Sequence, residues 1–144
     1  MYPTKEEILA KPFPLSNKTV KKVLTWKTLQ FQGFKEKTTE EKLNALKDLL
    51  LSLAPLSRPP KITLGDRYSY SMTQNTIYLD SHKASVISAL HELGHHLYGS
   101  SELKACRFSV HLFIICFPKA YKKLKWQNHM LIKKQNSPQT ATGP

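Results

Sequence analysis

The stretch His91-Glu92-Leu93-Gly94-His95 is the most informative pattern in this 144-residue sequence. Two histidines that stand four residues apart lie on one face of an α-helix, so both imidazoles can bind one metal ion. The glutamate after the first histidine is then placed to take a proton from a water molecule. Helical periodicity extends the stretch to residues 85–98, with Asp80 or Ser81 near the N-cap and Gly99 as the stop. We therefore predict a helix that carries a Zn²⁺ site formed by His91 and His95.

A catalytic zinc site needs a third protein ligand, and Glu102 is the nearest candidate. On an unbroken helix its Cα would lie about 10.5 Å along the axis from that of His95, too far for both side chains to bind one ion. The helix must therefore end between them, and Gly99 is suited to end it while Ser101 caps a new helix. An alternative interpretation needs no metal, because an acidic residue in a first helical turn also complements the helix dipole.

For several other polar residues around this motif, the sequence allows either a part in the site or a purely structural role. Cys106 lies one turn beyond Glu102 and is a fallback ligand, with a buried, unreactive thiol as the simpler interpretation. His111 falls on the opposite face of the same helix from Glu102, so we expect it in the core or at the surface. The remaining candidates either hydrogen-bond a substrate oxyanion or are satisfied locally: His82, His96, His129, Tyr98 and Tyr121.

Helical signals fill the first part of the chain and short β segments follow them. Two capping boxes, at residues 4–7 and 38–41, open helices within residues 1–55. Three short segments rich in β-forming residues predict a small antiparallel sheet: residues 61–64, 67–72 and 76–79.

The sequence as a whole predicts a single α+β domain over residues 1–135, in which the small antiparallel sheet packs with the metal-binding helix and flanking helices. Its three parts are a helical N-terminal region, the sheet with the metal-site helices, and a basic C-terminal helix: residues 1–55, 61–117 and 118–135. Residues 136–144 lack apolar anchors and predict a flexible tail.

Positive charge is concentrated in the last part of the chain. The net charge is +12, and no Asp or Glu follows Glu102, so the 42 residues after it carry eight Lys or Arg and a charge of +8. With Tyr121 and Trp126 among them to stack on bases, this part is a candidate surface for nucleic acid. The alternative is a solvated helix face whose lysine stems shield the core.

Composition also bears on the compartment. The longest apolar run, residues 110–117, is far shorter than the roughly 20 residues of a membrane helix, so we expect no membrane contact. The N-terminus shows no basic and apolar pattern of a secretory signal, which favours the cytoplasm. Cys106 and Cys116 lie about 15 Å apart on one predicted helix, too far for a disulfide, which agrees with a reducing compartment.

Residues 76–112 resemble those of zincin-type metallopeptidases, and in particular the ImmA/IrrE-like group and small metallopeptidases encoded by phages. The HELGH motif is intact, and residues 102–109 are similar to the following helix of that group, often E-x-E-A-x-R-F-A. Lys104 stands where an acidic residue is usual, which leaves Glu102 as the nearest carboxylate. The resemblance implies a zincin-like fold, with His91 and His95 as zinc ligands and Glu92 as catalytic base. In a phage-encoded protein the compartment would be the host cytoplasm.

Three functions from different classes follow from these observations. The first is a small metalloendopeptidase that cleaves a protein or peptide substrate, with Glu92 as general base. The second is a non-catalytic module of zincin fold that contacts nucleic acid or a host or regulatory protein through its basic C-terminal part. The third is a small interaction protein without metal. The glutamate inside the motif favours the enzyme, because a purely structural zinc site needs no base beside its ligands.

Overall fold

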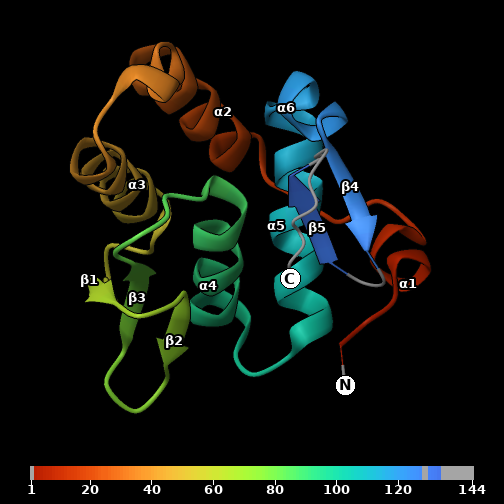
Figure 1. Ribbon diagram of the computed structural model, residues 1–144. Coiled ribbons are helices and arrows are strands. Elements are labelled where there is room, and N and C mark those ends of the chain that lie inside the picture. The colour runs from red at the N-terminus through yellow and green to blue at the C-terminus, as the bar shows by residue number, and fades with distance from the viewer. Residues whose placement is uncertain (1, 128–129, 134–144) are drawn as a thin grey trace.

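The computed structural model describes residues 2–127 and 130–133, which form an α+β fold (Figure 1). Its helices, in chain order, are α1 (Lys5–Leu9), α2 (Asn17–Trp26), the π-helix η1 (Lys27–Phe31), the 3-10 helix η2 (Phe34–Glu36), α3 (Thr39–Leu53), α4 (Val86–Tyr98), α5 (Glu102–Cys116) and α6 (Pro118–Lys122). Its strands are β1 (Lys61–Gly65), β2 (Ser69–Ser71), β3 (Thr76–Asp80), β4 (Leu124–Gln127) and β5 (Met130–Lys133).

Both predicted capping boxes are present. The Thr4 hydroxyl accepts a hydrogen bond from the Glu7 N–H while the Glu7 carboxylate accepts one from the Thr4 N–H, and Thr38 and Glu41 repeat the pattern at α3. Each box satisfies two backbone donors that the first helical turn leaves unpaired. The N-terminal part of the fold is therefore helical, as its sequence predicts.

The prediction of an antiparallel sheet is wrong, because the three-stranded sheet is mixed. Strand β3 lies in the centre, with β1 parallel to it on one edge and β2 antiparallel on the other. β3 is the most buried strand, and pairing both of its edges satisfies its backbone away from water. Residues 66–68, which follow β1, carry the chain past the end of β3 to its other edge, where β2 pairs with β3.

Helices α4 and α5 form the centre of the molecule as a helical hairpin (Figure 1). One face of α4 packs on strands β2 and β3, and α3 packs beside it. The core includes leucines of α3, α4 and α5 that are fully buried: Leu46, Leu50, Leu90, Leu93 and Leu112. The core thus holds the α4 helix from two sides and leaves the side toward α5 for the polar motif.

The basic helix predicted for residues 118–135 forms only over Pro118–Lys122, so its predicted extent is wrong. Helix α6 ends at Lys122, and β4 and β5 follow as an antiparallel hairpin. Leu124 and Trp126 stand two residues apart, the spacing of one strand face, and each packs on a hydrophobic cluster. The predicted tail, residues 136–144, lies outside the described residues. Among the helices of the described part, none is long and apolar enough to cross a membrane.

Candidate metal centre

The break between the motif helix and the next helix forms where the sequence requires it. Helix α4 ends at Tyr98, and Gly99 has a φ of 82°, a left-handed value that glycine adopts without the steric cost other residues carry. The Ser101 hydroxyl then accepts a hydrogen bond from the Lys104 N–H and caps α5, which begins at Glu102. At the other end, Ser85 caps α4, so the predicted caps Asp80 and Ser81 are wrong.

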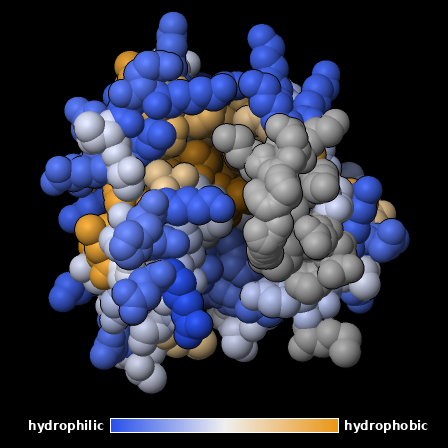
Figure 2. All heavy atoms as spheres, in the orientation of Figure 1, coloured by the Kyte–Doolittle hydropathy of each residue, from blue (hydrophilic) through white to orange (hydrophobic). Residues whose placement is uncertain are grey.

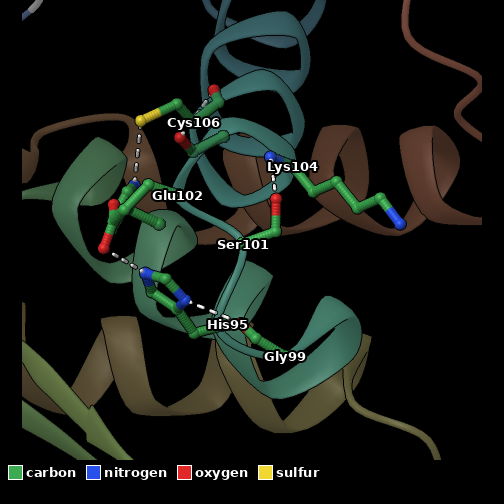
Figure 3. Close-up of polar contacts among 8 residues, drawn as sticks. His95, Gly99, Ser101, Glu102, Lys104 and Cys106 are labelled. Carbon is green, nitrogen blue, oxygen red and sulfur yellow. Dashed lines mark hydrogen bonds and ion pairs between the residues drawn. The ribbon is translucent and has the colours of Figure 1, made fainter. Parts of the chain in front are cut away.

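This turn brings the three predicted ligands together. Figure 3 shows two of them, Glu102 and His95, facing each other. One carboxylate oxygen of Glu102, Oε1, lies 3.1 Å from His91 Nε2, and the other, Oε2, lies 3.0 Å from His95 Nε2. The ligand atoms of all three residues lie within 4.8 Å of one another. His91, His95 and Glu102 could therefore hold one metal ion.

The hydrogen bonds around these residues suit a cation. His95 Nδ1 lies 2.8 Å from the Gly99 carbonyl oxygen, which only accepts, so Nδ1 carries a proton and neutral His95 presents a lone pair on Nε2. That lone pair faces a carboxylate oxygen, and two acceptors at 3.0 Å repel unless a positive charge lies between them. Glu102 Oε1 is buried and, among the described residues, receives no hydrogen bond of suitable geometry. Burial also lowers the pKa of His91, which favours the neutral imidazole that binds metals.

Cys106 lies behind His91 and is not placed as a ligand. Its Sγ is 3.8 Å from His91 Nδ1, the ring nitrogen that faces away from Glu102. Burial raises the pKa of its thiol to about 12, so the group is protonated near neutral pH. Cys106 is therefore a buried thiol, the simpler of the two interpretations, and it contacts a candidate ligand. The Lys104 side chain points away from His95 and Glu102 (Figure 3).

Glu92 is buried beside the metal candidates and lines a cavity of about 230 Å³ together with His91 and Cys106. Burial raises the pKa of its carboxyl to about 7, a rise that His95 opposes and the charge of Glu102 supports. A bound cation nearby would lower this pKa, because it favours the carboxylate. Figure 2 shows a hollow in the middle of one face, in the region of α4 and α5, with hydrophilic residues in its lower part and hydrophobic ones above.

The cavity is lined by α1, near the start of the chain, and by α4 and α5, which follow each other much later in the sequence. Apolar side chains of α1, α4 and α5 contribute Ile8, Ile87 and Val110. Tyr2 also lines it, and burial raises the pKa of its hydroxyl, with smaller contributions from the charges of Glu102, Cys106 and Glu92. Sequence reasoning missed Tyr2, because no local pattern connects it to a motif so far along the chain.

The other candidates from the sequence lie outside the metal group. His96 is buried, with Nδ1 3.1 Å from the Tyr70 hydroxyl and Nε2 2.9 Å from the Arg58 carbonyl oxygen. His111 Nε2 lies 2.8 Å from the Ile8 carbonyl oxygen, away from Glu102 as predicted, and His82 is exposed near Asp80. The two remaining tyrosines also have other contacts, Tyr98 with Phe13 and Phe108, and Tyr121 with Trp126. His129 lies outside the described residues.

Comparisons of this chain with protein-family models, curated proteins and solved structures found no match. The function is therefore argued from the chemistry and geometry of the site, since a fold on its own does not determine an activity.

Proposed function

We propose that this protein is a zinc-dependent peptide-bond hydrolase of zincin type, with Glu92 as its general base. The observation that carries the proposal is the convergence of His91, His95 and Glu102 within 4.8 Å, next to a cavity that Glu92 lines. The turn at Gly99 lets the Glu102 carboxylate approach both His91 and His95, and the dipole interpretation of Glu102 does not require this approach.

Two imidazoles and one carboxylate are a donor set typical of catalytic zinc, which keeps a further position for water or substrate. Zn²⁺ bound there would supply a Lewis acid that polarises a substrate carbonyl and lowers the pKa of a water molecule. The Gly99 carbonyl orients His95 through Nδ1, and Cys106 contacts Nδ1 of His91, so each ring has a partner on the side opposite Glu102.

The chain supplies the proton transfers through Glu92. Its carboxylate would accept the proton of the attacking water on one oxygen as the water oxygen bonds to the carbonyl carbon. The same oxygen would then deliver that proton to the amide nitrogen as the C–N bond breaks. The cavity beside Glu92 has apolar walls from Ile8, Ile87 and Val110, which suit an uncharged side chain of a protein or peptide substrate.

The decisive experiment compares zinc-loaded wild-type protein with Glu92→Gln on a mixture of peptides of varied sequence, with products identified by mass spectrometry. We expect cleavage by the wild type and none by the variant, while both bind one zinc per chain, because Glu92 is not among the ligand candidates. The variant keeps the size and shape of the side chain and removes only the base.

Other results would contradict the proposal in different ways. Equal cleavage by both proteins would indicate a contaminating peptidase and remove Glu92 from the mechanism. One zinc per chain without cleavage would favour the non-catalytic module, and absence of zinc binding when zinc is supplied would favour an interaction protein.

A further inference from the structure

Two helices of the fold carry exposed lysines and no acidic residue. Helix α2 contributes Lys18 and Lys21, and the segment of α6 with its C-cap contributes Lys119, Lys122 and Lys123. We call these five residues the α2–α6 lysines. Neither helix contains Asp or Glu, although the chain has ten of them.

The α2 and α6 helices lie at the same end of α5. Lys27, directly after α2, donates a hydrogen bond of 2.8 Å to the carbonyl oxygen of Cys116, the last residue of α5, and its ammonium lies over the ring of Phe117. Helix α6 begins at the next residue, and Figure 1 places α2 and α6 at the top of the molecule. In Figure 2 hydrophilic side chains project from this top edge. Lysines from the two ends of the chain therefore share one end of the fold.

Among the described residues, no carboxylate forms an ion pair with these lysines. Among the side chains that the structure describes, no Lys or Arg nitrogen lies within 4.0 Å of a carboxylate oxygen, since each recorded ion pair involves a histidine. Asp48 of α3 lines the same shallow pocket as Lys18 and Lys21 without pairing with either. The surface thus presents unpaired positive charge to a polyanion.

We propose that the α2–α6 lysines bind the phosphate backbone of duplex DNA, independently of the metal centre. The aromatic residues nearby argue against single strands, which need exposed rings for stacking: Trp26 is 5% exposed, and Tyr121 and Trp126 are half-buried. A membrane surface fits less well, because interfacial helices insert an apolar face and Val23 and Trp26 of α2 are buried in the core.

The test measures binding to a fluorescent 20-base-pair DNA duplex by anisotropy from 50 to 200 mM salt. Five phosphate contacts give a log–log salt slope of about −4.5, or a roughly 500-fold loss of affinity across this range. We expect the variant with all five α2–α6 lysines changed to Gln to lose most binding, and each single change to flatten the slope by about one. The matched control changes five exposed lysines elsewhere to Gln: Lys11, Lys47, Lys61, Lys83 and Lys104.

Because all ten lysines are exposed, both variants should keep the wild-type unfolding midpoint, and this is measured first. Equal loss of binding in both variants would overturn the proposal, since net charge alone would then explain it. Tighter binding to a single strand, or equal binding to phosphatidylserine vesicles with the same lysine dependence, would also overturn it. The Glu92→Gln variant and the zinc-free protein should bind DNA as tightly as the wild type does. Loss of DNA binding and loss of peptide hydrolysis are therefore distinguishable results.

Discussion

Gly94 of α4 and Ala105 of α5 are in direct backbone contact, and a Cβ atom on Gly94 would lie 2.9 Å from the Cα of Ala105. No real side chain tolerates that separation, so the two helices approach this closely only because residue 94 is glycine. The contact lies between His91 and His95 in sequence and one turn after Glu102. Glycine in the HELGH motif therefore sets the distance across which Glu102 meets both histidines.

Gly94→Ala should lower the free energy of unfolding by about 1–2 kcal/mol. Forcing a methyl group into this contact costs about 1–3 kcal/mol, and the better helix propensity of alanine returns up to about 1 kcal/mol. Urea unfolding of the zinc-free protein measures the change. Lys104→Ala is the control, because this exposed side chain should alter stability by no more than about 0.5 kcal/mol. An unchanged midpoint for Gly94→Ala would mean that the helices separate without cost.

The sequence predicts the metal group because its geometry is local. The spacing of His91 and His95 places both on one helical face, and the distance to Glu102 requires the break that Gly99 provides. Each inference depends only on the rise and turn of a helix. The convergence of the three side chains is therefore confirmed, and it involves a short stretch of sequence in which no distant contact competes with helix geometry.

Features that depend on contacts between distant parts of the chain were predicted wrongly or missed. β1 pairs in parallel with β3 because β3, the most buried strand of the sheet, takes the central position. Tyr2 reaches the cavity only through the packing of α1 against α5. The C-terminal lysine-rich segment shows a helical composition, yet Leu124 and Trp126 find hydrophobic partners as a strand. Burial overrides local propensity in such segments.

Zinc should raise the free energy of unfolding of the wild-type protein, and most of this increase should require Glu102. At a free zinc concentration 100 times the Kd, binding to the folded state adds about 2.7 kcal/mol to the unfolding free energy. Glu102→Ala removes one of the three candidate ligands and should remove most of this gain, while Asp66→Ala, which removes an exposed acid elsewhere, should keep it. Thermal unfolding with zinc and with a chelator measures both. A full zinc gain in Glu102→Ala would show that Glu102 is not a ligand.

His96→Ala and His95→Ala should have opposite effects although they are neighbours. Loss of His96 empties a buried position and removes the ring nitrogen that contacts the Arg58 carbonyl oxygen. It also removes one of two partners of the Tyr70 hydroxyl, which still donates to Asn75. This should cost about 2–4 kcal/mol and leave zinc stoichiometry at wild-type level. Loss of His95 should abolish or sharply weaken zinc binding. Calorimetric zinc titration and urea unfolding distinguish the two, and loss of zinc in folded His96→Ala would contradict its structural role.

Cys106→Ala should weaken zinc binding without removing a ligand. The thiol is the partner of His91 Nδ1, and loss of an outer partner of a metal-bound histidine typically costs 10–100-fold in affinity. Because sulfur accepts hydrogen bonds weakly, we expect about 10-fold, at the lower end of this range. Cys106→Ser keeps an acceptor at the same position and should recover most of the affinity.

The matched control for this prediction is Cys116→Ala, on the same helix and also buried but far from the motif. Both alanine variants lose a buried sulfur and a comparable amount of packing, so both should unfold more easily than wild type. Only the change at Cys106 should raise the Kd for zinc. If both variants bind zinc as wild type does, the contact between Cys106 and His91 is packing alone, and the orientation of His91 must come from the α4 helix itself.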